Sequence, residues 1–435
     1  MLKNKGIPSL KVLLISVNTE TINIPVLPLG LAFVHAALPV QEFETKMINL
    51  MDTADAKLLL KETISSFQPD AIGISIRNID TQDIKNPGFM LTPVKSVITW
   101  CREHSESPII IGGAGYSIFP AAALDYLGAD MGIKGEGEAA FPDLLRKISA
   151  HQPVTDIPGL YLPKQGAVMP RQCIKHTPGI RFPLPGIHLN IPDKIKEKNL
   201  WIPFQTRRGC PMNCSYCSTG SIEGRLIRKL PVKRAIETLT AYADAGFKHF
   251  FFVDNTFNLP PAYAEALCDE IISKSLNIAW RCILYPAKIN ERLIQKMTRA
   301  GCREVALGFE SGSDEILKRF NKRFNTKDIR RTSIMLKKYG IAQLGFLMFG
   351  GPGETKTTVK KSLEFAESLN LEALKLTTGI RIYPDTSLAD IAINEGIIDV
   401  DDTLLMPKFY IRKGLAEWLM NKVTSWGEGR PNCLY

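Results

Sequence analysis

The sequence lacks an apolar run that could cross a membrane. Its longest apolar stretch, residues 24–40, is interrupted by three prolines and by His35, whereas a spanning helix needs about 20 consecutive apolar residues. A charged lead at residues 1–10 precedes a short strand-like apolar run, and no small-residue cleavage site follows it. We therefore expect neither a transmembrane segment nor a secretory signal peptide.

Cysteine is scarce, with nine residues among 435, and these are scattered apart from one cluster of three. An odd, scattered set in a long chain does not fit a disulfide scaffold, so we expect a reducing, cytoplasmic location. The composition is 45% hydrophobic and 23% charged, which is typical of globular proteins and excludes disordered, fibrous and repeat classes. The length allows two or three domains of about 150 residues each.

Positive charge is in excess, with 54 Lys and Arg against 44 Asp and Glu. Part of the excess lies in residues 318–338, which carry nine basic side chains and one acidic one, Asp328. A solvated outer helix explains such a segment, and peripheral contact with a membrane is the alternative. No nucleic-acid partner is expected, because aromatic residues do not alternate with the basic ones at the spacing of a base-stacking platform.

Residues 10–150 alternate short β-rich apolar runs with amphipathic helical segments. Strands are expected at 11–17, 43–48, 71–76, 109–112 and 130–133, with helices at 29–38, 54–67, 94–104, 118–126 and 138–148. Continuous apolar strands separated by helices predict an α/β, doubly wound parallel sheet that binds its ligand at the carboxyl ends of the strands. Small residues recur at those ends, at 16–18, 75–78, 112–115 and 134–138, where a ligand can approach the backbone.

A second alternating region follows a proline-rich linker at 151–199, in which residues 160–162 and 167–169 predict a small hairpin. Residues 200–398 repeat strand and helix six times, which predicts a partial (β/α)6 barrel with its chemistry at the carboxyl ends of the strands. The expected strands are 201–207, 249–253, 278–283, 304–309, 342–348 and 373–382. Residues 399–435 are expected to close the barrel with one helix near 414–423.

The strongest functional signal is Cys210, Cys214 and Cys217, three cysteines within eight residues directly after the first barrel strand. Three thiolates can bind three irons of a [4Fe-4S] cluster and leave the fourth iron without a protein ligand. An open metal position is typical of a catalytic site. A zinc site is the alternative; it would need a fourth ligand from the linker and usually uses paired cysteines. The candidates for that ligand are Cys173, His176 and His188.

The Cys-x3-Cys-x2-Cys triplet, with Tyr216 before its third cysteine, resembles the radical SAM superfamily. The resemblance implies that the open iron binds S-adenosylmethionine (SAM) and that an electron from a donor such as flavodoxin or ferredoxin splits it into a 5′-deoxyadenosyl radical. Tyr216 is expected to shield the cluster. The cofactors supply this chemistry, while the protein positions them and excludes water.

Other strand ends of the barrel resemble the same family. The resemblance implies contacts with SAM from Asp254, Asn255, Glu310, Gly350, Arg381 and Tyr383. Turn glycines and helix-capping carboxylates are the alternative for these positions. Five single cysteines are expected to be buried and inert, with Cys282 as the one that could face the barrel interior. They are Cys101, Cys268, Cys282, Cys302 and Cys433.

A doubly wound domain before such a barrel resembles the cobalamin-binding class of this superfamily. The implied corrinoid contacts are Gly30, Ser75, Arg77, Gly112, Gly113, Gly115, Gly135, Glu136 and Gly137. The Asp-x-His-x-x-Gly motif, which gives cobalt a histidine ligand in many cobalamin proteins, is absent, so we expect no such ligand. Loss of the corrinoid and an unrelated nucleotide-binding domain remain alternatives, since fold alone does not fix the ligand.

The two resemblances predict a cobalamin-dependent radical SAM methyltransferase. Its cofactors would be a [4Fe-4S] cluster, SAM and cobalamin, and it would methylate an unactivated carbon of a small or lipid-like substrate through the 5′-deoxyadenosyl radical and methylcobalamin. A cyclisation, hydration or ring rearrangement with the same cofactors is one alternative. A non-catalytic carrier or regulator that binds a corrinoid or an iron–sulfur cluster is the other.

Overall fold

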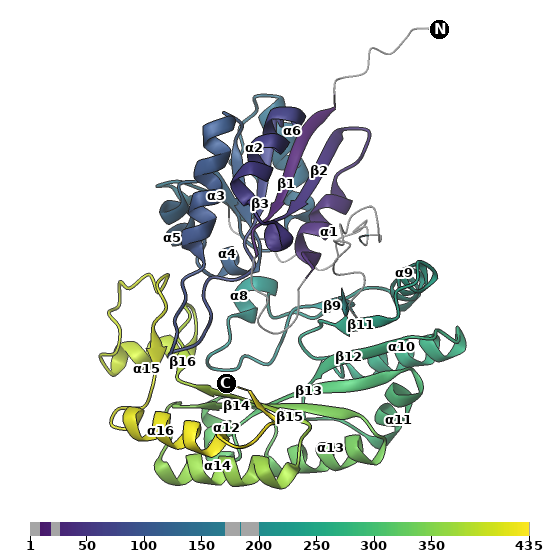
Figure 1. Ribbon diagram of the computed structural model, residues 1–435, viewed down its shortest axis with the longest axis vertical. Coiled ribbons are helices and arrows are strands. Elements are labelled where there is room, and N and C mark those ends of the chain that lie inside the picture. Colours follow the sequence, from purple (N-terminus) through teal and green to yellow (C-terminus); the bar gives the residue numbers. More distant parts are fainter. Residues whose placement is uncertain (1–8, 19–26, 170–182, 184–199, 435) are drawn as a thin grey trace. The chain divides into compact units, whose positions relative to one another are not determined.

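The computed structural model describes residues 9–18, 27–169, 183 and 200–434 (Figure 1). The candidate zinc ligands Cys173, His176 and His188 lie outside these residues. The chain divides into two compact units, residues 1–81 with 88–198, and residues 82–87 with 199–435. None of the helices in the described ranges combines the length and apolarity that a membrane crossing requires.

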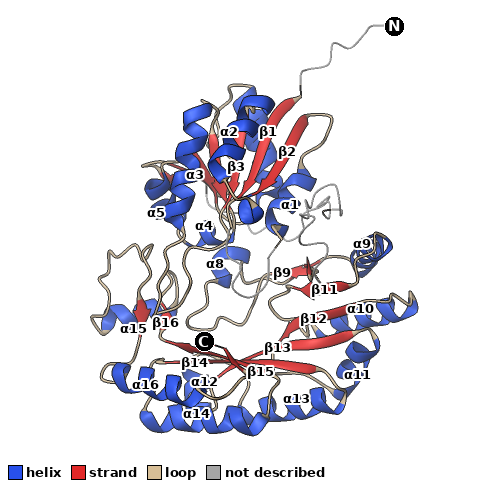
Figure 2. Cartoon of the chain, in the orientation of Figure 1, coloured by secondary structure: helices blue, strands red, loops and turns tan. Residues whose placement is uncertain are grey.

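The first unit contains a seven-stranded sheet in the order β2-β1-β3-β4-β5-β6-β7, with helices on both faces (Figures 1 and 2). Its first five strands are parallel, and the order 2-1-3-4-5 is that of a doubly wound sheet whose order reverses beside β1 and β3. The strands are β1 (Leu10–Ser16), β2 (Phe43–Asn49), β3 (Ala71–Ser75), β4 (Ile109–Gly112), β5 (Met131–Ile133), β6 (Leu160–Leu162) and β7 (Gly166–Ala167). The helices are α1 (Leu29–Ala37), η1 (Leu50–Asp52), α2 (Ala56–Phe67), α3 (Leu91–His104), α4 (Ala114–Ile118), α5 (Pro120–Leu127) and α6 (Gly137–Ser149).

The central strands of this sheet are covered on both faces. Val12, Leu13, Leu14 and Ile15 of β1 are all fully buried, as expected for a parallel strand between two helical layers. Each such side chain stabilises the fold by about 1.5–3 kcal/mol through removal of apolar surface from water. This core fixes the strands, and therefore the loops at their carboxyl ends.

Two local predictions for the first unit differ from the structure. The hairpin of β6 and β7 was expected in the linker, but β6 pairs antiparallel with β5 and so extends the first sheet. Leu160 is fully buried there, so removal of its side chain from water stabilises the pairing of the hairpin with the sheet. The helix expected at 118–126 is α5 (Pro120–Leu127), which begins at Pro120 because a proline at the first helical position loses no hydrogen bond. The short helix α4 (Ala114–Ile118), which precedes it, was not expected.

The second unit contains a parallel sheet in the order β18-β15-β14-β13-β12-β11-β8. Its strands are β8 (Ile202–Phe204), β11 (His249–Phe252), β12 (Ala279–Leu284), β13 (Cys302–Glu310), β14 (Ala342–Phe349), β15 (Ala373–Thr378) and β18 (Cys433–Leu434). The helices are α9 (Val232–Asp244), α10 (Pro261–Ser273), α11 (Glu291–Arg299), α12 (Asp314–Arg319), α13 (Thr326–Lys338), α14 (Lys356–Leu369), α15 (Ser387–Asn394) and α16 (Ala416–Gly427). The six expected strands are therefore followed by a short seventh one, β18.

The last expected strand, 373–382, is interrupted. Gly379 adopts φ +77° and ends β15, and the chain continues as β16 (Ile380–Arg381), which pairs with β17 (Phe409–Tyr410). A left-handed residue cannot continue a strand, and glycine accepts that conformation without a steric penalty.

The two faces of the second sheet differ in burial. Alternate side chains such as Phe250, Cys282 and Phe309 are fully buried. Phe250 packs against Tyr242 of α9, and Phe309 packs against Phe365 of α14, so these side chains face the helical layer that Figure 1 shows along the sheet. The intervening side chains on β11 to β15 are only partly buried. We call the latter side the half-buried face. Chemistry is expected at the carboxyl ends of its strands.

Candidate active site

The three predicted cluster ligands lie on one loop, between β9 (Arg207–Arg208) and α8 (Thr219–Glu223). Cys210 and Cys214 are partly buried, and Cys217 is exposed. The loop is turned tightly: the Cys217 amide donates to the Cys214 carbonyl at 3.2 Å, and the Cys210 amide donates to the Gly224 carbonyl at 3.1 Å. Gly209 begins the turn at φ +87°, and a Cβ there would lie 2.1 Å from the Leu226 carbonyl oxygen.

The electrostatics of this loop indicate that its thiols are neighbours. Burial raises the pKa of Cys210, and the nearby Cys217 and Cys214 raise it further. Over the described ranges, no three His, Cys, Asp or Glu side chains gather around one ion position. A [4Fe-4S] cluster takes one thiolate per iron. Three thiols on one loop are the donor set that such a cluster with one open iron needs.

Asp254, just after β11, holds the base of the cysteine loop. Its carboxylate accepts hydrogen bonds from the Thr206 amide (2.7 Å), the Thr206 hydroxyl (2.6 Å) and the Arg207 amide (2.9 Å). The Arg207 guanidinium lies 3.2 Å from the same carboxylate, and the two side chains are 2% and 0% exposed. Both Asp254 oxygens are thus engaged within the protein, which makes Asp254 a positioning residue; its predicted contact with SAM stays a prediction.

Asn255 supports the same loop through Glu223, the last residue of α8. The Asn255 amide nitrogen donates to Glu223 Oε2 at 2.6 Å, and this oxygen also accepts from the Gly209 amide at 2.8 Å. The two ends of the cysteine loop are therefore joined through one carboxylate.

Residues 320–323, which follow α12, form a second support that the sequence interpretation missed; we call them the clamp. The Phe320 carbonyl accepts from the Ser215 amide at 3.1 Å. Asn321 donates to the Asn213 carbonyl at 2.7 Å, and Arg323 donates to the Pro211 carbonyl at 3.2 Å. Three of the four clamp residues, Phe320, Asn321 and Arg323, thus hydrogen-bond to the backbone of the loop that carries the thiols.

Lys322 and Glu310 join this clamp to β13. Lys322 Nζ lies 3.3 Å from Glu310 Oε1, and the side chains are 5% and 15% exposed. The same ammonium is 5.3 Å from the centre of the Tyr216 ring, and Phe320 packs edge-on against that ring. The prediction of a solvated basic face is wrong for Lys322. The sequence analysis did not use its aromatic neighbours Phe320 and Phe324, which could have indicated burial.

The remaining predicted SAM contacts lie after β14 and β15. Gly350 ends β14 at φ +100°, and its amide, like that of Gly351, donates to the carboxylate of Glu354. Burial raises the pKa of Glu354 to about 7. Arg381 is 4% exposed and donates to the carbonyls of Ile382 and Leu404, beside the Tyr383 ring. The roles of Gly350, Arg381 and Tyr383 toward SAM stay predictions.

Cys282 faces helix α10 and is not on the half-buried face. It is fully buried together with Cys268 of α10 and Cys302 of β13, and burial raises the pKa of the Cys268 and Cys282 thiols. The suggestion that Cys282 lines the barrel interior is therefore wrong, because odd-numbered residues of β12 occupy the half-buried face.

The predicted corrinoid contacts lie at the carboxyl edge of the first sheet. Ser75 ends β3, Gly112 ends β4, Gly135 and Glu136 lie between β5 and α6, and Gly137 begins α6. Gly30 and Arg77 are exposed, and a Cβ on Gly30 would meet nothing within 4 Å. The edge thus offers accessible backbone, which fits a large ligand.

Two glycines at this edge also have a structural reason. A Cβ at Gly113, which adopts φ +105°, would lie 2.5 Å from the Ile76 carbonyl oxygen, and one at Gly115 would lie 3.0 Å from that of Arg77. Among the described histidines of this unit, His35 bonds to Thr45, while His104 and His151 lie outside the strand-end loops. Because close approach to the backbone already explains Gly113 and Gly115, their contacts with a corrinoid stay predictions.

Comparison with known families decides the class of the protein. Residues 205–366 match the radical SAM superfamily, and residues 15–145 match the B12 binding domain. The chain is a radical SAM protein with a B12-binding domain. The cysteine loop described above lies inside the first match, and the glycine-bearing strand edge lies inside the second.

The relatives of this radical SAM protein include methyltransferases, methylthiotransferases and a magnesium-protoporphyrin IX monomethyl ester cyclase. It is 28% identical to an uncharacterised methyltransferase of Pyrococcus horikoshii, over 85% of this chain and 79% of the relative. It is 23% identical to tryptophan 2-C-methyltransferase of Streptomyces laurentii, over 86% and 73%. Its fold matches the radical SAM methyltransferase TsrM of Kitasatospora setae, with a TM-score of 0.87, 21% identity and coverage of 96% and 88%. The predicted fold class, the radical SAM domain and the cobalamin-binding domain are confirmed.

Proposed function

We propose that this radical SAM protein methylates an unactivated carbon of a small or lipid-like substrate. The observation that carries the proposal is the three-thiol loop, which Asp254 and the clamp fix at the carboxyl end of the second sheet. When bound, the cluster, SAM and cobalamin supply the radical and the methyl group. The chain's own residues position these groups and keep water away from them.

The side chains of the half-buried face favour an apolar substrate. Ile283, Ala306, Leu344 and Phe346 lie on adjacent strands of this face and are partly buried. Apolar contact of this kind orients a substrate with little hydrogen-bonding capacity and excludes water from the reacting carbon.

Labelled SAM tests this function. The holoenzyme, reconstituted without oxygen with iron, sulfide and hydroxocobalamin, is incubated with methyl-deuterated SAM, a reductant and a lipid extract. We expect a deuteromethylated product together with S-adenosylhomocysteine and 5′-deoxyadenosine. Formation of 5′-deoxyadenosine with an altered but unmethylated product would instead indicate cyclisation, hydration or rearrangement. A full cluster with no SAM cleavage would indicate a carrier or regulator.

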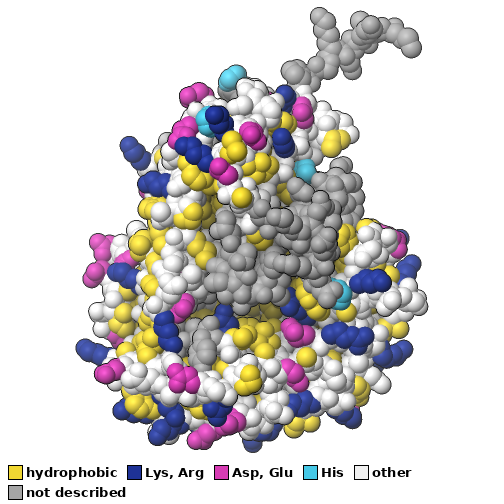
Figure 3. Space-filling view, viewed as in Figure 1, with side chains coloured by type: hydrophobic (Ala, Val, Ile, Leu, Met, Phe, Trp, Pro, Cys, Tyr) yellow, Lys and Arg dark blue, Asp and Glu magenta, His cyan; other side chains and the backbone are white. Residues whose placement is uncertain are grey.

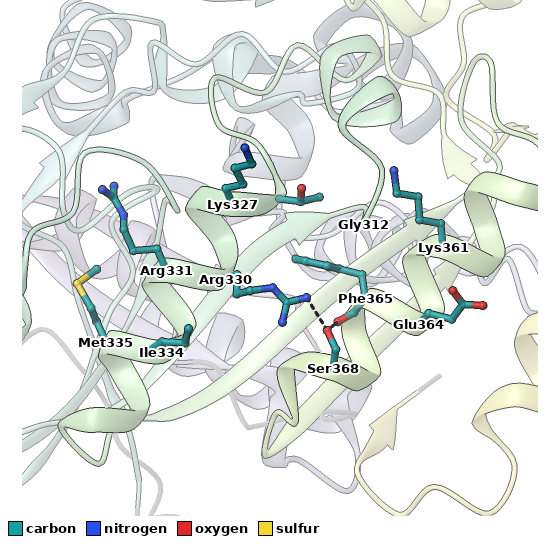
Figure 4. A pocket seen from close by; sticks show the side chains of 11 residues that line it. Gly312, Lys327, Arg330, Arg331, Ile334, Met335, Lys361, Glu364, Phe365 and Ser368 are labelled. Carbon is teal, nitrogen blue, oxygen red and sulfur yellow. Dashed lines mark hydrogen bonds between the residues drawn. The ribbon is translucent and has the colours of Figure 1, made fainter.

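We also propose that a small acidic electron-transfer protein, such as a flavodoxin or ferredoxin, reduces the cluster and docks between α13 and α14. A surface pocket of about 680 Å³ lies there, and we call it the α13–α14 groove. In Figure 4, Arg330 reaches across it to Ser368. Its lining includes Lys327, Arg330, Arg331 and Lys361 against one carboxylate, Glu364, and Ile334 is 60% exposed.

Two features favour this partner. In Figure 3, basic and acidic side chains are mixed over the visible face. The lining of the groove has four cations and one carboxylate, which makes it a local positive patch that attracts an acidic protein. Gly312, in the lining, is two residues from Glu310, which contacts Lys322 beside Tyr216. The groove is thus connected by a short stretch of chain to the supports of the cysteine loop.

Charge reversal tests this docking site. For Arg330→Glu/Arg331→Glu, we expect the ratio of flavodoxin-driven to dithionite-driven 5′-deoxyadenosine formation to fall at least tenfold, because loss of complementary charge slows protein association. Lys337→Glu/Lys360→Glu makes the same change in net charge at exposed positions outside the groove and should leave the ratio within twofold of wild type. Equal losses in the two variants would refute the groove as the docking site.

A further inference from the structure

Arg281 of β12 is a largely buried cation whose ion pair with Glu304 is loose. Its side chain is 14% exposed, and the Glu304 carboxylate oxygen lies 3.8 Å from it, beyond hydrogen-bond distance. Within residues 9–18, 27–169, 183 and 200–434, its Nε has no hydrogen-bond partner. Burying a guanidinium with unsatisfied donors is unfavourable, and an unsatisfied buried group of this kind calls for an explanation such as a missing ligand.

Two aromatic rings hold this guanidinium in place. Its Cζ lies 4.6 Å from the centre of the Trp201 ring and 4.7 Å from that of Phe251. Contact with the ring faces fixes the plane of the guanidinium, while the N–H groups along its edge can still donate. Burial lowers the pKa of Arg281, but an arginine stays charged at neutral pH. A planar cation fixed in this way suits two parallel hydrogen bonds to a carboxylate or phosphate.

The position of Arg281 relates it to the candidate active site. Arg281 pairs in register with Glu304 of β13, and Glu310 at the other end of β13 contacts Lys322 of the clamp. Both glutamates are on the half-buried face, because the side chains of β13 alternate in burial. Six residues of strand separate them, which corresponds to about 20 Å. Arg281 therefore lies on the same face as the clamp contact, but near the opposite end of the strand.

The side chains between these two ends are mostly apolar. Ile283 and Ala306 are paired in register one step beyond Arg281, and Gly308 pairs with Phe346 at the next step. Lys375 of β15 is the charged side chain level with Phe346. The face thus presents Arg281 beside Glu304, then a mostly apolar stretch that includes Lys375, then the end of β13 beside the cysteine loop.

We propose that Arg281 binds an anionic head group of the substrate, and that the substrate is an elongated amphiphile with a carboxylate or phosphate at one end and an apolar body. This proposal rests on the proposed function and deepens it by naming the substrate class. The apolar body lies along the half-buried face, so the carbon that reacts is distant from the head group. Trp201 and Phe251 are positioning residues that orient the guanidinium.

Direct binding measurements test this inference without any turnover. Holoenzyme lacking SAM is titrated by calorimetry with dodecyl phosphate, dodecanoate and neutral dodecanol, each below its critical micelle concentration. We expect at least one anionic probe to bind ten or more times as tightly as dodecanol, and Arg281→Gln to abolish that preference. The tighter of the two anions identifies phosphate or carboxylate as the natural head group.

Control variants keep the test decisive. Arg303→Gln removes one positive charge from the exposed residue next to Glu304 and should retain the preference. Arg281→Lys should keep some preference but bind the anion several-fold more weakly, because an ammonium does not form a bidentate pair. Equal binding of dodecanol and the anions, or a preference that survives Arg281→Gln, would overturn the proposal. If Arg281→Gln does not fold, equal anion affinity in wild type and Arg281→Lys would overturn it. Because SAM is absent, a failure to methylate does not affect these outcomes.

Discussion

Replacement of Cys210, Cys214 or Cys217 by serine is expected to reduce 5′-deoxyadenosine formation below detection. Each thiolate binds a different iron, so loss of one leaves a cluster with two protein ligands, which is prone to lose iron. Neither a serine hydroxyl nor water replaces a thiolate on iron, because thiols ionise far more readily than hydroxyls. The measurements are the iron content of each anaerobically reconstituted variant and its yield of 5′-deoxyadenosine under dithionite.

Cys433→Ser is the matched control for these variants. Cys433 is a partly exposed cysteine in β18, outside the loop, so its replacement should leave iron content and SAM cleavage at wild-type levels. Substantial cleavage in any of the three loop variants would show that the missing thiol is not a cluster ligand.

Replacement of Asp254 by alanine is expected to lower the free energy of unfolding of the second unit by about 3–5 kcal/mol, the range for removing one partner of a buried ion pair. The change leaves the Arg207 guanidinium, now 2% exposed, without its carboxylate. It also leaves the Thr206 and Arg207 amides without their acceptor. Urea unfolding of the apoprotein, followed by circular dichroism, measures the shift. We further expect reduced iron incorporation, because these contacts fix the start of the cysteine loop.

Asp269→Ala provides the comparison, since Asp269 also pairs with a cation, Lys296 at 2.7 Å, but is 54% exposed. An exposed pair contributes about 0–1 kcal/mol, so this variant should unfold close to wild type. A loss for Asp254→Ala no larger than that for Asp269→Ala would contradict the structural role assigned to the buried pair.

The cysteine loop could be predicted from the sequence because its chemistry is local: three thiols within eight residues define both the donors and their spacing. The supports of the loop could not. Asp254 is 48 residues from Thr206, and Asn321 is 108 residues from Asn213, and nothing near the cysteines in the sequence marks either partner. Lys322 was expected to be solvated with its basic neighbours, since composition does not reveal which lysine meets a buried carboxylate.

The prediction of helices and strands likewise succeeded for long elements and failed for short ones. The strand and helix alternation predicted the two α/β regions, because continuous apolar strands and amphipathic helices produce strong periodic patterns. Short elements were missed or placed in the wrong context. β18 has two residues, too few for a period, and the β6–β7 hairpin gave no local sign that it joins the first sheet. The sequence also did not show on which face of β12 Cys282 lies, because that depends on which face of the sheet the helices cover.

The central claim is that this chain holds an iron–sulfur cluster on three cysteines and a corrinoid on its first unit. Metal analysis tests it most directly, on protein that is produced with cobalamin, purified without oxygen and not reconstituted. We expect about four irons per chain, as a [4Fe-4S] cluster requires, together with one cobalt, and a SAM-dependent change in the electron paramagnetic resonance spectrum of the reduced cluster. Stoichiometric zinc in place of iron, lost in Cys214→Ser, would contradict the claim.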